Sequence, residues 1–360
     1  MQLRWLNLLR TMMAACVAGP AVAGSPTWAL AGGAQAGGAQ AGRVQGANAL
    51  LNVSYDPTRE LYKDVNQHFA ADWKTRTGQT LSIKTAHGGS GAQARAVLDG
   101  LQADVVTLGL AWDIDVLAQH KLIDAGWQTR LPNHSVPYTS TVVFLVRKGN
   151  PKSLHDWADL VHDGVEVITP NPKTSSGGRW SYLAAYAWAL HRPGGGEPAA
   201  EAYLAALYKH VPVLDTGARG ATNTFVQRGE GDVLLAWEDE ALLAANDVGR
   251  GQFDIVYPST SIKAEPPVAL VDSVTARHGT TQLAQAYLRF LFSHEGQELA
   301  SKHHYRSIDP TIFAEHKADF PPVKTYDVDS LGGWETVQAR HFADGGLFDT
   351  IYGAANTARK

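Results

Sequence analysis

From residue 49 onward, short apolar runs alternate with longer segments that have the pattern of amphipathic helices. Runs at 50–54, 81–85 and 104–108 are rich in the aliphatic residues typical of buried strands. Helices are expected at about 60–75, where apolar residues recur every fourth position, and at 92–101. Strands that alternate with helices predict an α/β fold, in which a parallel sheet is flanked by helices.

The alternation repeats further along the chain. A strongly β-branched run at 139–146 is followed by Pro151 and polar residues, which indicates a crossing into a second lobe. The later expected strands are 165–169, 232–237, 253–257 and 268–272, and the later expected helices are 179–190, 199–210, 282–293 and 332–342.

The repeated alternation predicts two lobes, each with a parallel-type sheet flanked by helices. We expect residues 49–140 and 256–360 to form the first lobe and residues 141–255 to form the second. Ligands of open α/β sheets bind beyond the carboxyl ends of the strands, so a cleft between the lobes is the expected ligand site. Clefts of this kind close on a ligand by hinge motion.

The length and the charge narrow the function classes. A chain of 360 residues, of which 44% are hydrophobic and 18% charged, is typical of a globular protein with two domains. The formal net charge of −4 argues against nucleic acid as a partner, because such binding calls for a basic surface. Any anion must therefore be held by local groups and not by the net field of the protein.

The N-terminus has the pattern of a secretory signal peptide at residues 1–31. Arg4 and Arg10 precede an Ala-rich apolar run, and small residues that suit cleavage follow it. A retained membrane anchor is the alternative interpretation of this segment. Residues 32–48 are rich in Gly, Ala and Gln and are expected to form a flexible linker. The one cysteine, Cys16, lies inside the signal, so the mature chain has no disulfide and no Cys ligand for a metal.

The segment 171–180 places small residues between an expected strand and an expected helix. Ser175, Ser176, Gly177 and Gly178 allow the backbone to approach a bound group closely, and the first N–H groups of a helix have no partner inside the helix. Such a turn is a candidate anion site. It lacks the G-x-x-x-x-G-K-[ST] pattern of nucleotide-binding loops, and an ordinary capped helix start is the alternative.

Three other segments occupy comparable positions. They are His87–Gly91, Asp215–Gly220 and Ala236–Asp239. The first two are small turns that open helices, and the third offers the indole N–H of Trp237, which donates but cannot accept. A site made of donors suits a fully ionised oxyanion, because burying such an ion is costly unless its oxygens are hydrogen-bonded.

Six motifs together resemble the periplasmic sulfate-binding proteins. They are Ser-Tyr-Asp-Pro-Thr-Arg-Glu-Leu-Tyr at 54–62, His-Gly-Gly-Ser-Gly at 87–91, Ala-Asp-Val-Val-Thr-Leu at 103–108, Asn-Pro-Lys-Thr-Ser at 171–175, Asp-Thr-Gly-Ala-Arg-Gly at 215–220 and Gly-Asp-Val-Leu-Leu-Ala-Trp-Glu at 231–238. The resemblance covers residues 49–345. It implies the two-lobed fold of type II periplasmic binding proteins and a monomer that captures sulfate or thiosulfate in the periplasm and delivers it to an ABC permease in the membrane.

The same resemblance implies a set of ligand contacts. Most are backbone N–H groups, with one serine hydroxyl, here that of Ser175, and one indole. Carried onto this sequence, they fall on Ser90, Ser175, Ser176, Gly177, Ala218 and Trp237. The chain departs from the family pattern in one place: Ser176 stands where glycine is usual and Gly178 where alanine is usual.

Asp56, Arg179 and Arg219 are supporting candidates. Asp56 is expected either to brace the first turn with Arg59 or to form a local cap, and both arginines either to help neutralise the anion or to form structural salt bridges. His303 and His304 suggest a solvated helix end and not a metal site.

The resemblance implies a protein with no cofactor and no enzymatic activity. The alternatives within the same class bind thiosulfate, molybdate or phosphate. A secreted hydrolase such as a sulfatase or phosphatase is the alternative from another class, but the sequence has no G-x-S-x-G pattern, and the candidate turns offer donors and few metal ligands.

Overall fold

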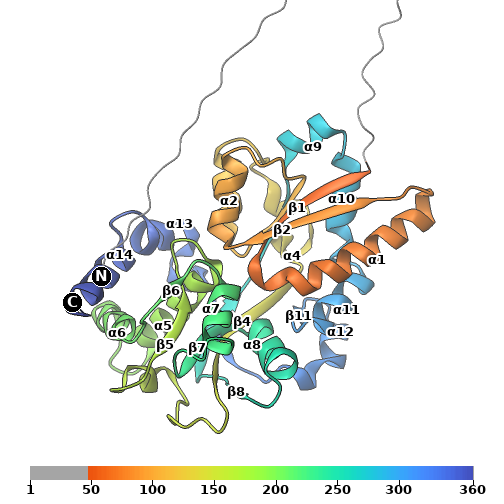
Figure 1. The fold of residues 1–360 in the computed structure, drawn as a ribbon. Coiled ribbons are helices and arrows are strands. Elements are labelled where there is room, and N and C mark those ends of the chain that lie inside the picture. Colours follow the sequence, from red (N-terminus) through yellow and green to blue (C-terminus); the bar gives the residue numbers. More distant parts are fainter. Residues whose placement is uncertain (1–47, 360) are drawn as a thin grey trace, which may run out of the picture. The chain divides into compact units, whose positions relative to one another are not determined.

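The computed structural model describes residues 48–359, which form two β-sheets with helices packed on them (Figure 1). The expected signal peptide at 1–31 and linker at 32–48 lie outside the described residues, apart from Asn48. Among the residues described, none of the helices combines the length and the apolar character needed to cross a bilayer.

The first sheet has four strands in the order β10-β3-β1-β2. They are β1 (Ala49–Tyr55), β2 (Ser82–Gly88), β3 (Val105–Thr107) and β10 (Val268–Leu270). The expected parallel pairing is confirmed for β1 with β2 and with β3, because α1 (Arg59–Thr77) and α2 (Ser90–Leu98) provide the crossovers that parallel neighbours require. The edge strand β10 differs, since it pairs antiparallel to β3.

Helix α1 shows how local sequence sets an element of this sheet. Leu61, Val65 and Phe69 recur every fourth position and are buried. The helix ends at Gly78, which has φ of 74° and donates its N–H to the Lys74 carbonyl at 2.8 Å. Glycine adopts this left-handed conformation without the clash that a Cβ atom would introduce.

The second sheet is organised around β4 (Tyr138–Arg147). The main path is β12-β9-β4-β7-β5-β6, and β8 and β11 also pair with β4. The other strands are β5 (Val167–Pro170), β6 (Leu214–Asp215), β7 (Val233–Trp237), β8 (Phe253–Val256), β9 (Thr260–Ala264), β11 (Arg306–Ser307) and β12 (Lys324–Tyr326). Strand β5 is parallel to β6 and β7 as expected, but β4 is antiparallel to β7, β8 and β9. The second sheet is therefore mixed.

Helices cover both sheets. The longer ones not yet named are α3 (Ala111–Gln119), α4 (Pro132–Ser135), α5 (Ser176–His191), α6 (Glu197–Lys209), α7 (Ala218–Val226), α8 (Glu238–Leu243), α9 (Asp272–His278), α10 (Thr281–Phe290), α11 (His294–Lys302), α12 (Pro310–Glu315), α13 (Gly333–Val337) and α14 (Leu347–Arg359). Short 3₁₀ and π turns are η1 (Asp56–Thr58), η2 (Trp127–Thr129), η3 (Trp157–Val161), η4 (Ala244–Val248), η5 (Lys317–Asp319), η6 (Asp329–Leu331) and η7 (Gln338–Phe342).

The sheets divide the chain differently from the expected lobe boundaries. We use the term first lobe for the four-stranded sheet with α1, α2, α3, α9 and α10, and second lobe for the larger sheet with α5 to α8 and α14. Residues 256–360 were expected in the first lobe, yet β9 pairs with β4, β12 pairs with β9, and α14 packs on α6. These long-range pairings have no local sequence signal, and they place part of the C-terminal region in the second lobe.

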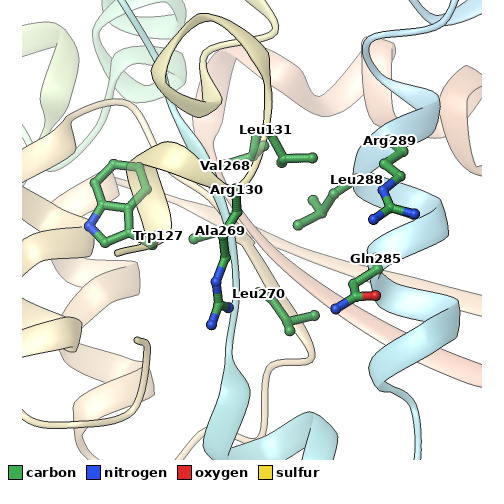
Figure 2. Close-up of a pocket in the computed structure, with 9 residues that line it drawn as sticks. All are labelled: Trp127, Arg130, Leu131, Val268, Ala269, Leu270, Gln285, Leu288 and Arg289. Atoms are coloured by element: carbon green, nitrogen blue, oxygen red, sulfur yellow. The ribbon is translucent and has the colours of Figure 1, made fainter. Parts of the chain in front are cut away.

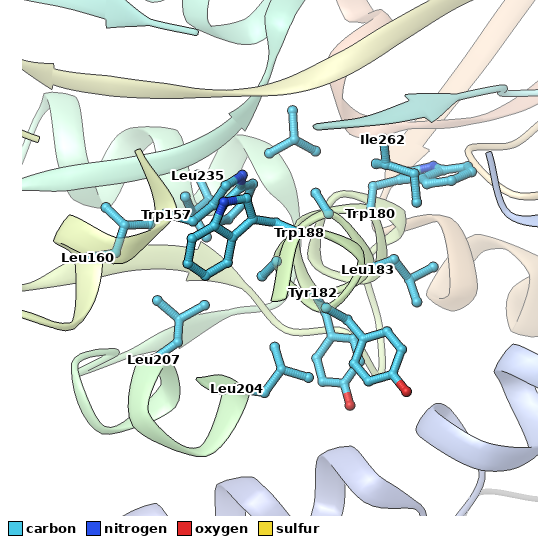
Figure 3. Close-up of a cluster of buried hydrophobic side chains, with 14 of the residues drawn as sticks. Trp157, Leu160, Trp180, Tyr182, Leu183, Trp188, Leu204, Leu207, Leu235 and Ile262 are labelled. Carbon is cyan, nitrogen blue, oxygen red and sulfur yellow. The ribbon is translucent and has the colours of Figure 1, made fainter. Parts of the chain in front are cut away.

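The second lobe is centred on the buried helix α5. Residues 176–189 of this helix are all buried, because it packs against α6 and against several strands of the sheet. A helix that is covered on every side tolerates few charges, and its sequence is accordingly rich in Ala, Trp and Tyr. Figure 3 shows Trp188 of this helix in the same cluster as Trp157 and Leu204 from neighbouring segments.

Trp157 provides a test of this core. Its side chain is fully buried, lies at 4.8 Å from the Phe144 ring in a T-shaped arrangement, and donates its indole N–H to the Thr260 carbonyl at 2.8 Å. Trp157→Ala should lower the free energy of unfolding by about 3–5 kcal/mol, because it leaves a large cavity. Urea denaturation measures the change.

The control is Val248→Ala at an exposed position, which should change the free energy of unfolding by about 0.5 kcal/mol or less. Similar small effects at both positions would contradict this description of the core.

Candidate functional site

Three helices begin where the two lobes meet. Helix α2 starts at Ser90 just after β2, α5 starts at Ser176 after β5, and α7 starts at Ala218 after β6. In Figure 1, α2 belongs to the upper sheet and α7 to the lower one. All three predicted turns therefore open helices. Helix α5 begins three residues earlier than expected, because the Ser175 side chain caps it by accepting from the Gly178 N–H.

The three turns contact one another across the lobes. The Ala92 N–H donates to the Thr174 carbonyl at 3.4 Å, and the Thr174 hydroxyl donates to the Thr216 carbonyl at 2.8 Å. A methyl group placed on Gly89 would clash with the Thr174 carbonyl and lie 2.7 Å from the Thr216 carbonyl oxygen. The turn that opens α2 thus lies directly against the turns that open α5 and α7.

Four of the predicted backbone donors have no acceptor among the residues that the structure describes. Within residues 48–359, the N–H groups of Ser90, Ser176, Gly177 and Ala218 make no hydrogen bond. They are the first N–H groups of their helices, where no intrahelical acceptor exists. The prediction that the Ser175 N–H is also available is wrong, because this group donates to the Asn171 carbonyl at 2.9 Å. The hydroxyl proton of Ser175 is still available, since its oxygen only accepts, at 3.4 Å, from Gly178.

Trp237 ends β7 and faces the start of α5. Its side chain is 2% exposed, and the indole Nε1–H is buried without an acceptor among the described residues. A methyl group placed on Gly177 would lie 2.8 Å from this nitrogen and 3.4 Å from the Ala218 Cβ, so the three residues adjoin. The Tyr55 ring packs beside the indole at 5.2 Å. A buried donor without a partner costs about 1–3 kcal/mol, so the indole points to an acceptor supplied from outside the chain.

The Ser90 side chain has a structural partner. Its hydroxyl donates to Asp113 Oδ2 at 2.6 Å and accepts from the Gly109 N–H at 3.0 Å. Only the backbone N–H of Ser90 is therefore available to a ligand. Asp113 and Gly109 were not predicted from the sequence, because neither lies in a recognisable ligand motif.

Arg179 forms a buried ion pair that joins the lobes. Its Nη1 lies 3.5 Å from Asp113 Oδ1 on α3, its Nε donates to the Pro172 carbonyl at 2.9 Å, and its guanidinium lies over the Phe342 ring. Burial raises the pKa of Asp113 and lowers the pKa of Arg179, while the attraction between the two charges opposes both shifts. Of the two alternatives for Arg179, the structural salt bridge is the one observed.

Arg219 forms a second ion pair between the lobes. It donates to both carboxylate oxygens of Glu60 on α1, at 3.0 and 2.8 Å, and to Glu240 on α8 at 2.7 Å. Burial opposes the charge of Arg219, but hydrogen bonds and attraction from the two carboxylates raise its pKa overall. For Arg219 too, the structural salt bridge is observed.

Asp56 lies against the turn that opens α7. Its Oδ1 accepts from Arg59 at 2.7 Å, and its Oδ2 lies so close to Gly217 that a methyl group there would clash. Glu238, which follows Trp237, directs both oxygens away to Arg306 at 2.7 and 2.8 Å. Formal charges around the site are therefore largely paired with one another.

Lys173 anchors the turn before α5 to the C-terminal region. Its ammonium donates to the Phe342 carbonyl at 3.1 Å, to Asp344 at 3.1 Å and to Asp349 at 3.0 Å. Burial opposes the charge of Asp349, but the hydrogen bond from Lys173 lowers its pKa overall. The residues just before and at the start of α14 thus hold the turn that precedes α5, which is far away in the sequence.

Two features lie apart from the turns. A pocket of about 230 Å³ in the first lobe is shown in Figure 2. None of the residues predicted for the site lines this pocket. Its lining consists of Trp127, Arg130, Leu131, Val268, Ala269, Leu270, Gln285, Leu288 and Arg289. His303 lies at the end of α11, as expected, and its Nε2 is 3.0 Å from Asp64 Oδ2.

The comparisons with known proteins agree with the fold. Residues 58–306 match the family described as bacterial extracellular solute-binding protein. The sulfate-binding protein of Escherichia coli K12 is 56% identical over 84% of this chain and 92% of that protein. The thiosulfate-binding protein of Pseudomonas aeruginosa is 51% identical over 85% of this chain and 92% of that protein. The solved structure of the sulfate-binding protein SubI from Mycobacterium tuberculosis H37Rv matches with a TM-score of 0.74 at 32% identity, over 82% of this chain and 99% of that one.

The Glu60–Arg219 pair predicts a dependence of stability on pH. Burial opposes the charge of Glu60, but its hydrogen bond to Arg219 lowers the pKa from its ordinary value of 4.5. A lowered pKa stabilises the fold above the unfolded value, and this contribution is lost as the pH falls through the folded value. Glu60→Gln should therefore be less stable than the parent at neutral pH, and the difference should shrink below pH 4.5.

Urea denaturation at a series of pH values measures the difference. Glu335→Gln, at an exposed position on α13, is the control and should behave as the parent does. A difference between Glu60→Gln and the parent that stays constant from neutral to acidic pH would show that the ion pair does not contribute in this way.

Proposed function

This chain belongs to the bacterial extracellular solute-binding proteins, and we propose that it captures sulfate between its two lobes and delivers it to an ABC permease. The observation that carries the proposal is the buried indole N–H of Trp237, which has no acceptor among the described residues and lies beside Gly177 and Ala218. The proposed ligand contacts are the N–H groups of Ser90, Ser176, Gly177 and Ala218, the hydroxyl of Ser175 and the indole of Trp237.

The donors suit the chemistry of sulfate. Sulfate is a dianion at neutral pH and offers only acceptors, while each of these groups offers a proton. The start of a helix also favours negative charge, so the three helix starts stabilise the ion without a countercharge in contact with it. Arg179 and Arg219 support the site indirectly, because their own carboxylate partners already take up their charge.

Thiosulfate is the second candidate. The Pseudomonas aeruginosa relative, 51% identical, is named for thiosulfate, so both ligands have support from similar proteins. Thiosulfate replaces one oxygen by sulfur, which is larger and a weaker hydrogen-bond acceptor. A site whose proposed contacts are all N–H and O–H donors therefore favours sulfate.

We propose that the protein acts by binding and not by catalysis. The similar proteins are named for binding sulfate or thiosulfate, which supports this role. The family is described as extracellular, which supports export of this protein. Residues 1–31 would be the signal peptide for that export. We propose that the mature protein works as a monomer in the periplasm. Binding, closure of the lobes and docking on the permease would follow in that order.

Removal of the indole donor should weaken binding. Trp237→Phe keeps an aromatic ring and deletes the N–H. A hydrogen bond to a charged group is worth about 1.5–3 kcal/mol, so the Kd for sulfate should rise by about one to two orders of magnitude. Isothermal titration calorimetry measures the change, with Trp157→Phe in the core as the control for loss of an indole elsewhere. An unchanged Kd in Trp237→Phe would assign this side chain to packing alone.

The anion preference tests the proposed function as a whole. Hydrogen phosphate carries a proton that would face another donor in this site, and sites that leave buried polar groups unpaired discriminate by about 10⁴–10⁵. Titrations of the mature protein with sulfate, thiosulfate, phosphate and molybdate should show sulfate bound tightest and phosphate very weakly. Sulfate affinity should stay nearly flat around neutral pH, since the ligand does not titrate there. Phosphate that displaces sulfate at similar concentration would mean that Asp56 accepts its proton, and the donor-only site would be wrong.

A further inference from the structure

Gly109 is held by both lobes at once. It lies between β3 and α3, and its N–H donates to the Ser90 hydroxyl at 3.0 Å within the first lobe. Its carbonyl accepts from the indole Nε1 of Trp180, on α5 of the second lobe, at 2.8 Å. Hydrogen bonds on both sides of one residue fix its position relative to the start of α5.

The Cα atom of Gly109 faces Ser176. A methyl group placed on Gly109 would clash with the Ser176 hydroxyl and would lie only 2.5 Å from the Ser176 Cβ. The next neighbour, Cδ2 of Tyr55, would lie at an ordinary 3.4 Å. The backbone of Gly109 is not in the left-handed region, so an alanine could adopt its conformation. Residue 109 must therefore be glycine because the Ser176 side chain occupies the space that a Cβ atom would need.

Ser176 has little freedom to move away. It is the first residue of α5 and is 2% exposed. The preceding Ser175 N–H is bound to the Asn171 carbonyl, and Gly178 is so close to the Pro170 carbonyl that a methyl group there would lie at 2.5 Å. A rotation of the Ser176 side chain would move its hydroxyl but not its Cβ, so the clash would remain.

We infer that the contact between Gly109 and Ser176 sets how closely the two lobes approach, and thereby positions the α5 donors around the anion. The inference rests on the proposed function. Gly109 is a positioning residue, since it does not donate to the ligand itself. A methyl group at 109 would hold the lobes apart by the overlap with the Ser176 Cβ, and the donors of Ser90 and of Gly177 would then no longer reach one ion together. Removing the Ser176 side chain would restore the space.

A double-mutant cycle tests the inference. The variants are Gly109→Ala, Ser176→Gly and the double variant, with Gly353→Ala in α14 as a control, because a methyl group there meets no atom within 4 Å. Calorimetry gives the Kd for sulfate, and small-angle scattering with and without sulfate reports compaction. Gly109→Ala should raise the Kd by about 100-fold and lose the compaction that sulfate induces in the parent. The double variant should regain that compaction and bind within about tenfold of Ser176→Gly.

The outcomes separate the inference from the proposed function. If the parent binds sulfate and Gly109→Ala binds as the parent does, or the double variant binds no better than Gly109→Ala, the inference is overturned and the proposed function stands. If the parent does not bind sulfate, both are overturned. Should Gly109→Ala alone fail to fold, recovery of a folded, sulfate-binding protein on adding Ser176→Gly supports the contact, and a double variant that also fails to fold overturns it.

Discussion

Hydrogen-bond donors without acceptors are the constraint around which this structure is arranged. The first N–H groups of α2, α5 and α7 and the indole of Trp237 meet at the junction of the lobes, and no acceptor in residues 48–359 takes them up. A buried donor that lacks an acceptor, as this indole does, destabilises a fold by about 1–3 kcal/mol. Under the proposed function, a fully ionised oxyanion would accept from all of these donors at once, which would couple ligand binding to the junction of the lobes.

The charged residues near the junction are paired with one another, so under the proposed function the donors and not a net charge would select the ligand. Asp113 neutralises Arg179, Glu60 and Glu240 neutralise Arg219, and Arg59 neutralises Asp56. A free arginine in contact would attract any anion, including phosphate in either protonation state. With these charges paired, discrimination depends on whether the ligand carries a proton of its own.

The local elements could be predicted from the sequence because their causes are local. The spacing of Leu61, Val65 and Phe69 determines α1, and the β-branched run around Val142 determines β4. The small residues that end strands predicted the three turns. The antiparallel pairing of β4 and the place of β9 and β12 in the second sheet could not be predicted, since they depend on which distant strands meet.

The site residues also divide into those with a local sequence signal, which were predicted, and those that depend on long-range contacts, which were not. Trp237, Gly177 and Ala218 lie in motifs whose residue types suit an anion, and the structure brings them together. The roles of Asp113 and Gly109 arise only when one lobe lies against the other, so no neighbouring residue in the sequence indicates them. The unavailable N–H of Ser175 was missed because its acceptor, the Asn171 carbonyl, belongs to a tight turn whose geometry the sequence does not specify.

The anchor between Lys173 and the C-terminal region has a consequence for biogenesis. Phe342, Asp344 and Asp349 hold the turn that precedes α5, yet they follow Lys173 in the sequence by 169, 171 and 176 residues and so leave the ribosome long after it. If the chain is exported, they also emerge from the secretory channel long after that turn. Every strand of both sheets precedes these residues in the chain, but the turn before α5 stays without its anchor until they emerge. A protein truncated before Phe342 would keep every strand of both sheets and lack the groups that anchor the turn before α5.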